Sequence, residues 1–434
     1  MIFSNFIIHS RTKFLLKNIS GPLLSKIVNL ASTLVLVPLA LNGLGSNDYG
    51  IFAAILAAMI FFSYSDLGLG LVIVNKVAYS KCKETLLEAK IAISSVWFFL
   101  IYISLTIMFL GTLTSFFLSV LNIATYSKAI SFGLTLSSCF SLGLAPSLTQ
   151  RILFGMQKNL EANLWNSLSK LFSLFGVYLA YSFHASIEYY LLSVIGLPAL
   201  IAWVSTISIW LRFPDFKPEK KYYSRDKLGT YIPEGFRYLF LQLGVFFEAG
   251  IDNILIIFVL GSTFVTKFDL LAKLFLYIPA LMSLIIFPLW PAIAQAKAHG
   301  DLLWIKKILV ISYLFVGFAS IVLASLLVFS HSKILHLWTG VDYMPNYSLA
   351  FAVGIFSILT SLGSLQSIVF NSLNLLNLQV RALAIFLILL IPSKLFALFF
   401  YGPVAMVWSL NFLYIIKLVS LVFLNKLFSK NKSL

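Results

Sequence analysis

Long uncharged apolar runs alternate with short polar breaks along the whole chain, for example over 27–47, 189–211, 274–296 and 308–332. A membrane-spanning helix needs about 20 such residues, so each run is long enough to cross a bilayer. The pattern predicts an all-α, polytopic membrane protein with about 12 spans. We expect them at 19–41, 49–75, 91–119, 129–153, 160–182, 188–211, 235–260, 265–294, 304–330, 346–371, 379–400 and 403–424.

Composition supports this class. The chain has 434 residues, of which 60% are hydrophobic and 11% charged, whereas a soluble domain has about 25% charged residues. Soluble, disordered and disulfide-rich secreted proteins are therefore excluded. Only two cysteines are present, so no disulfide framework is predicted.

The densest polar stretch lies at the midpoint, at 212–233, and predicts a cytoplasmic linker between lobes 1–211 and 234–434. An internal repeat agrees, because Leu44-Gly45-Ser46 recurs as Leu260-Gly261-Ser262 at an offset of 216. Six spans restore the starting side of the membrane, so the copies run in parallel. We therefore expect two six-helix lobes related by a pseudo-twofold axis along the membrane normal.

Charge predicts the orientation. The net charge is +16, which in a soluble protein would suggest nucleic acid. Here the excess is explained by topology, since 23 Lys and Arg fall in, or within four residues of, the segments on the amino-terminal side, and three fall in or near the segments on the other side. Positive residues gather in cytoplasmic loops. Both termini are therefore expected in the cytoplasm, with no nucleic-acid partner.

Ionisable residues inside spans are costly and mark functional sites by default. Lys170 and Lys394 occupy equivalent spans of the two lobes, and Lys273 lies about nine residues into the eighth span. Lys26 is shallower, and snorkelling to the membrane surface is an equal alternative for it.

Three carboxylates accompany these lysines. Glu248 and Asp252 are four residues apart and share a helix face, and Asp252 lies at the depth of Lys273, which predicts an ion pair. Asp66 precedes Gly68 and Gly70, so its alternative role is a helix-end cap.

Motifs for chemistry are absent from the sequence. It contains no GxxxxGK[ST], HExxH or paired CxxC pattern, so we predict no ATP motor, metal site or cofactor. The expected external loops are short, which favours a transporter over an enzyme such as a polysaccharide polymerase.

Several loop motifs point to a family. The segments Leu44-Gly45-Ser46-Asn47-Asp48-Tyr49-Gly50, Asp66-Leu67-Gly68-Leu69, Asn75-Lys76 and Phe154-Gly155-Met156-Gln157 resemble the Wzx-type O-antigen/polysaccharide flippases. These belong to the multidrug/oligosaccharidyl-lipid/polysaccharide exporter (MOP) superfamily.

The resemblance implies a flippase of the bacterial inner membrane that moves undecaprenyl-pyrophosphate-linked oligosaccharide by alternating access, for O-antigen and lipopolysaccharide biosynthesis. The expected partners are the lipid-linked oligosaccharide, membrane lipid, and the polysaccharide polymerase and chain-length machinery. Lysines suit an anionic pyrophosphate. The expected substrate-binding residues are Lys26, Lys170, Lys273 and Lys394. The carboxylates expected to bind a coupling ion or to compensate charge are Asp66, Glu248 and Asp252.

Two other functions stay open at this point: a cation-coupled multidrug exporter of the same superfamily, and a membrane scaffold. A drug exporter would need carboxylates to dominate its cavity. The spans instead hold five lysines (Lys26, Lys170, Lys273, Lys394, Lys417) and four carboxylates (Asp66, Glu248, Asp252, Asp269), which favours an anionic cargo.

Overall fold

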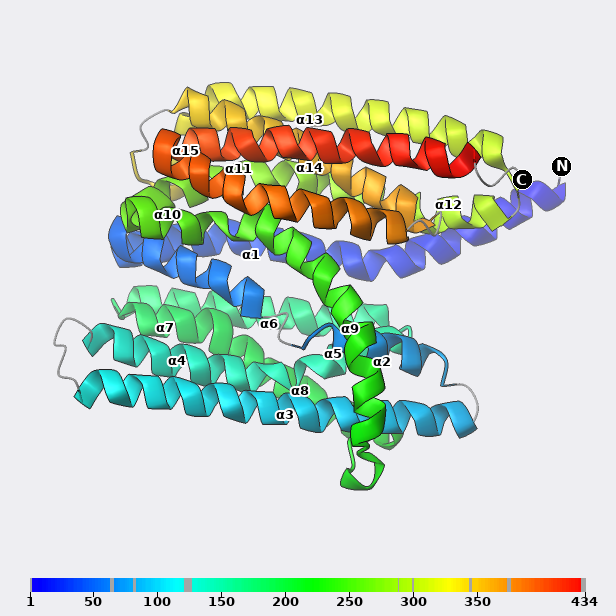
Figure 1. Cartoon of the computed structure of the whole chain (residues 1–434), viewed down its shortest axis with the longest axis horizontal. Helices are drawn as coiled ribbons and strands as arrows, with labels where there is room; N and C mark the ends of the chain where they lie inside the picture. Colours follow the sequence, from blue (N-terminus) through cyan, green and yellow to red (C-terminus); the bar gives the residue numbers. More distant parts are fainter. Residues whose placement is uncertain are drawn as a thin grey trace. The chain divides into compact units, whose positions relative to one another are not determined.

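The computed structural model describes residues 2–62, 66–80, 83–120, 127–287, 289–298, 300–342, 346–372 and 376–430. Within these ranges the chain is helical and contains no β-strand (Figure 1). In this described part, seven helices are long and apolar enough to cross a membrane, or eight if the bent helix pair Arg225–Glu248 and Asp252–Leu260 is one span. The expected all-α polytopic membrane fold is confirmed.

The elements in chain order are α1 (Ile2–Phe62), α2 (Leu69–Ala78), α3 (Lys83–Val120), α4 (Ser127–Leu144), α5 (Ser147–Gly155), α6 (Asn159–Ser182), α7 (Ile187–Leu191), η2 (Leu192–Gly196), α8 (Leu197–Arg212), η3 (Pro214–Phe216), η4 (Lys220–Tyr222), α9 (Arg225–Val245), η5 (Phe246–Gly250), α10 (Asp252–Leu260), α11 (Ser262–Ile286), α12 (Leu289–Ala298), α13 (Leu302–Thr339), α14 (Tyr347–Ser372) and α15 (Leu376–Lys430).

Two of these helices contain more than one expected span. α15 includes both 379–400 and 403–424, and its helix is broken at Gly402, where φ is 81°. Its halves run out and back, orange then red in Figure 1, and they pack together, with the rings of Phe386 and Tyr414 5.9 Å apart. α1 likewise contains the first expected span and the start of the second, with a break at Gly45.

The described chain divides into two compact units. Unit 1 comprises the residues up to Asp48 and Met59–Gln242, and unit 2 comprises Tyr49–Ala58 and Leu243–Leu434. The ten residues Tyr49–Ala58 thus belong with the carboxyl-terminal helices. The lobe boundaries expected at 212–233 stay a prediction.

The core of unit 1 is built from α2, α3, α4, α5 and α9. Buried Trp97 of α3 lies at its centre, with ring centroids 5.9 Å from Trp203 and 5.0 Å from Trp210. The polar stretch after α8 is hydrogen-bonded to α3. The hydroxyls of Ser94 and Ser95 in α3 accept from the backbone N–H groups of Glu219 and Ser224.

The core of unit 2 lies where α11, α13 and α14 meet. Met282 and Ile286 of α11 pack there with Val316 of α13 and with Leu365 and Ile368 of α14. Apolar side chains on one face of each helix give the three helices a shared interior.

The internal repeat is matched by backbone conformation. Gly45 has φ 73° and ψ 171°, and Gly261, its partner at the offset of 216, has φ 87° and ψ 173°. This region of conformational space is essentially restricted to glycine. The repeated Leu-Gly-Ser motif therefore marks the same sharp helix break twice.

Replacing Gly45 or Gly261 by alanine is expected to lower the free energy of unfolding by about 1–3 kcal/mol each. No atom lies within 4 Å of an added Cβ at either position, so the loss would come from the backbone alone. Chemical unfolding of the detergent-solubilised protein measures it. Gly229→Ala is the matched control, because that site is equally open but has ordinary helical φ; an equal effect at all three sites would contradict the assignment.

Candidate functional site: charged groups in the membrane-spanning helices

A network of hydrogen bonds in unit 2 is centred on Asp269 of α11. Its carboxylate accepts from the Tyr49 hydroxyl at 2.9 Å, from the Asn253 amide at 2.8 Å and from the Lys273 ammonium at 2.5 Å. Lys273 also donates to the Tyr49 hydroxyl at 3.0 Å. The network joins the segment Tyr49–Ala58 to α10 and α11 and satisfies a carboxylate that is 8% exposed.

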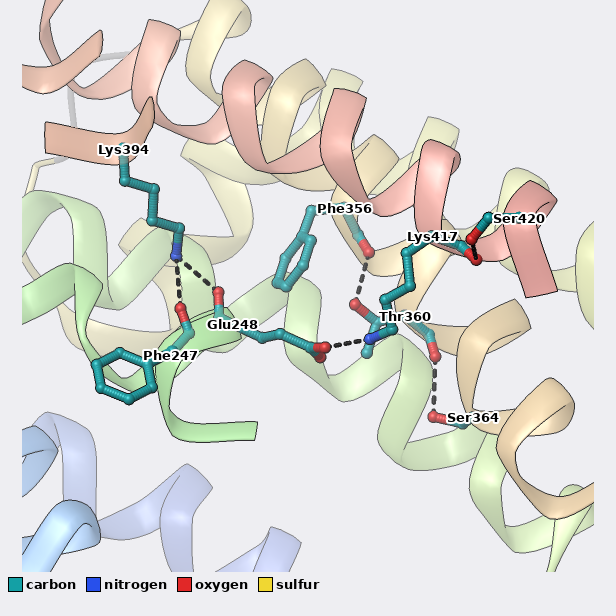
Figure 2. Close-up of polar contacts among 8 residues, drawn as sticks. All are labelled: Phe247, Glu248, Phe356, Thr360, Ser364, Lys394, Lys417 and Ser420. Carbon is teal, nitrogen blue, oxygen red and sulfur yellow. Dashed lines mark hydrogen bonds and ion pairs between the residues drawn. The ribbon is translucent and has the colours of Figure 1, made fainter. Parts of the chain in front are cut away.

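A second ion pair stabilises the interruption between α9 and α10. The five residues of η5 form a π-helix, Phe246–Gly250, whose wider turn leaves some carbonyls without their usual partners. The Lys394 ammonium of α15 donates to the carbonyls of Phe247 at 3.2 Å and Glu248 at 2.8 Å (Figure 2). It also pairs with Asp252 at 2.5 Å, and the two side chains are only 1% and 6% exposed.

A third ion pair joins Glu248 of η5 to Lys417 of α15 (Figure 2). Two aromatic rings flank this lysine, with the Lys417 ammonium 4.7 Å from the Phe386 centroid and 4.5 Å from that of Tyr414. Cation–π attraction adds to the ion pair at such distances. Lys394 and Lys417 of α15 therefore contact the same π-helical segment.

The expected ion pair between Asp252 and Lys273 is wrong. Lys273 instead pairs with Asp269, four residues earlier on its own helix, and Asp252 pairs with Lys394. Equal depth on consecutive helices does not make two side chains face each other. The i,i+4 spacing places Asp269 and Lys273 one above the other on the same helix face.

Asp66 has the geometry of a helix cap in unit 1. One of its carboxylate oxygens accepts from the Gly68 N–H at 2.9 Å and the other from the Gly70 N–H at 3.3 Å. Its side chain is buried. This arrangement matches the alternative of a helix-end cap, because it satisfies the N–H groups of Gly68, which precedes α2, and of Gly70 in its first turn.

Asp66→Ala is expected to lower the free energy of unfolding by about 0.5–2 kcal/mol, the usual cost of losing a cap. Asp66→Asn keeps an acceptor for the Gly68 N–H and should lose less. Denaturant titration of the two variants checks this order. An asparagine variant as unstable as the alanine variant would show that the negative charge, and not the cap, is what stabilises α2.

The remaining predicted lysines lie in unit 1. Lys26 of α1 is half-buried. Lys170 lines a cavity of about 320 Å³ between α4, α5, α6, η2 and α8, and more than a third of its side chain is exposed there. Of the four lysines expected to bind substrate, two thus have a carboxylate partner in the structure (Lys273 and Lys394) and Lys170 lies in a cavity.

No protein-family model matches the chain. The chain is 24% identical over 329 residues, 74% of either protein, to a Salmonella typhi protein named "Putative O-antigen transporter". The expected resemblance to the Wzx-type flippases is confirmed.

Solved structures agree on the fold. An inward-facing multidrug resistance MATE family transporter of the MOP superfamily has a TM-score of 0.70 and 13% identity, covering 93% of this chain and 99% of that one. The lipid II flippase MurJ, in an inward closed conformation, also has a TM-score of 0.70, with 16% identity over 95% of this chain and 87% of that one. The chain therefore has the fold of multi-pass membrane transporters, and the proteins that it resembles are transporters or flippases and not enzymes.

The sequence pattern missed two members of the Asp269 network, Tyr49 and Asn253. Their side chains are neutral and lie 220 and 16 residues from Asp269, so neither charge nor spacing identified them. Among the described residues no cluster of three or more His, Cys, Asp or Glu side chains could hold a metal ion.

Proposed function

We propose that this protein flips undecaprenyl-pyrophosphate-linked oligosaccharide units from the cytoplasmic to the periplasmic leaflet of the bacterial inner membrane, by alternating access, for O-antigen or other surface polysaccharide. The observation that carries the proposal is the similarity to the Salmonella typhi relative over 74% of the chain. The two solved folds match equally well and do not separate a flippase from a drug exporter.

The distribution of charge supports an anionic cargo. The carboxylates Glu248, Asp252 and Asp269 each form an ion pair with a lysine, and Asp66 caps α2. No carboxylate of these four is left to attract a cationic drug, whereas Lys170 faces a cavity. This balance favours the flippase over the multidrug exporter, and the cationic cavity at Lys170 favours it over a scaffold.

The four lysines have different roles in this proposal. Lys170 is assigned to the pyrophosphate headgroup, since a phosphate gains most from a cation that has no carboxylate partner in the described part of the chain. Lys26 is assigned to the same headgroup. Lys273 is 26% exposed and paired with Asp269, so it would contact the cargo through a shared network. Lys394 is 1% exposed, and its role is to stabilise the π-helical segment.

Glu248 and Asp252 are assigned to charge compensation of Lys417 and Lys394. Replacing each carboxylate together with its lysine by neutral residues should then leave flipping at no less than half of its normal rate. A complete loss of flipping in these paired neutral variants, with the protein still folded, would instead assign them to ion coupling.

Orientation and partners complete the proposal. The excess of Lys and Arg in the segments on the amino-terminal side supports an orientation with both termini in the cytoplasm. A polysaccharide polymerase and chain-length machinery on the periplasmic side would consume the flipped units.

The experiment is a strain in which this gene is deleted. We expect intact lipid-linked oligosaccharide to accumulate and surface polysaccharide to disappear, and both to return when the gene is restored. Normal surface polysaccharide together with new sensitivity to cationic drugs would overturn the proposal in favour of a multidrug exporter.

A further inference from the structure

The cavity in unit 1 has an unusual lining for the middle of a membrane-spanning helix bundle. Lys170 is the twelfth of the 24 residues of α6, roughly 16 Å from its first residue at 1.5 Å per residue. A charge at that depth costs at least about 2.5–3.5 kcal/mol if it faces lipid. Gln150 of α5 and Asn166 of α6 line the same cavity, so the space offers amide groups beside the ammonium.

Lys170 does not belong to the apolar surface of its helix. The exposed apolar positions of α6 repeat every three or four residues at Leu164, Leu168, Leu171 and Phe175. Asn166 and Lys170, four residues apart, lie off this stripe and line the cavity. The helix therefore presents one apolar face and one polar face, and the polar face borders the cavity.

Three polar side chains that line this cavity have no partner in the described part of the chain. Among the described residues, the side chains of Lys170, Gln150 and Asn166 have no hydrogen-bond or ion-pair partner. Lys273, Lys394 and Lys417 differ, since each has a carboxylate within reach. An ammonium and two amides grouped in this way suit a ligand with several acceptor oxygens and a negative charge.

An apolar groove adjoins the polar cavity. It has a volume of about 670 Å³ and lies among α4, α6, η2 and α8, and Cys139 lines both spaces. Leu142, Leu179, Leu192 and Leu200 of this groove are exposed on the outer surface of the unit. A hydrocarbon chain can lie in the groove while a polar headgroup attached to it reaches the cavity.

We infer that the cavity binds the phosphate headgroup of a polyprenyl lipid, with Lys170 as its cationic anchor, Gln150 and Asn166 as neutral donors, and the adjoining groove as the place of the hydrocarbon chain. The assignment of a polyprenyl lipid rests on the proposed function. The volume of the cavity at Lys170, about 320 Å³, is at the small end for ligand sites. It fits the phosphate groups and the sugar next to them.

The test is equilibrium binding of undecaprenyl pyrophosphate to the purified full-length protein, measured by native mass spectrometry. Lys170→Met should weaken binding by about tenfold to a hundredfold, the equivalent of one charged hydrogen bond, and Lys170→Arg should retain most of it. Undecaprenol, which has no phosphate, should bind at least tenfold more weakly. The matched control is Lys227→Met, an exposed lysine of the same unit, which should bind normally.

Unchanged binding in Lys170→Met would overturn the site. The polyprenyl assignment would be overturned if phosphatidylglycerol competed as well as undecaprenyl pyrophosphate itself and if its binding depended equally on Lys170. The cavity would then be a site for bilayer phospholipid. The deletion strain tests the proposed function separately. If lipid-linked oligosaccharide accumulates in that strain, if Lys170→Met rescues the strain fully, and if Lys170→Met also binds undecaprenyl pyrophosphate normally, then this site is refuted and the proposed flippase function is retained.

Discussion

Replacing Lys394 by methionine is expected to lower the free energy of unfolding by about 3–5 kcal/mol, the cost of removing one partner of a buried ion pair. The substitution leaves the Asp252 carboxylate, which is 6% exposed, without its cation. It also removes the donor to the carbonyls of Phe247 and Glu248. Denaturant titration of the detergent-solubilised protein measures the loss.

A double variant separates the ion pair from the support of the π-helix. Lys394→Met combined with Asp252→Leu removes both charges and should recover part of the loss, leaving about 1–3 kcal/mol for the unsatisfied carbonyls. The matched control is Lys76→Met, whose ion pair with Glu88 is exposed and worth at most about 1 kcal/mol. If Lys394→Met lowered the free energy of unfolding no more than Lys76→Met does, the role of Lys394 in stabilising the π-helical segment would be refuted.

Asp269→Ala is expected to be the second most damaging change, with a loss of about 3 kcal/mol in the free energy of unfolding. It leaves Tyr49, Asn253 and Lys273 without their shared acceptor. Because Tyr49 belongs to the segment that lies with the carboxyl-terminal helices, we also expect limited proteolysis to become faster between Tyr49 and Ala58.

Tyr49→Phe tests the same network more gently. It removes only the hydroxyl, which donates to Asp269 and accepts from Lys273, and should cost about 1 kcal/mol. The contrary result is a Tyr49→Phe variant as unstable as Asp269→Ala, which would place the stability of the network in the tyrosine hydroxyl and not in the shared carboxylate.

The helices were predictable because hydrophobicity in a membrane protein is a direct physical requirement. Twenty apolar residues have one stable arrangement in lipid, a helix that satisfies its own backbone. The structure adds that the Leu-Gly-Ser repeat falls where helices break, since Gly45 and Gly261 share one glycine-only conformation. The π-helical turn at Phe246–Gly250 carried no such signal, because none of its residues is restricted to that geometry.

The pairing of charges was less predictable than their presence. The sequence identified Lys273, Lys394, Glu248 and Asp252 as buried ionisable groups, and all four form ion pairs. It did not indicate which lysine meets which carboxylate. Asp252 and Lys394 are 142 residues apart, and their contact depends on the rotation of α10 and α15 about their own axes, which hydropathy does not determine.

The measurement that tests the central claim most directly is flipping by the purified protein in vesicles. Lipid-linked oligosaccharide is placed in the inner leaflet, and a membrane-impermeant enzyme that cuts the sugar chain reports headgroups arriving outside. We predict faster arrival than in protein-free vesicles, and a reduced rate with Lys170→Met. The account would be contradicted if headgroups reached the outer leaflet no faster than in protein-free vesicles while the same protein preparation exported a cationic dye.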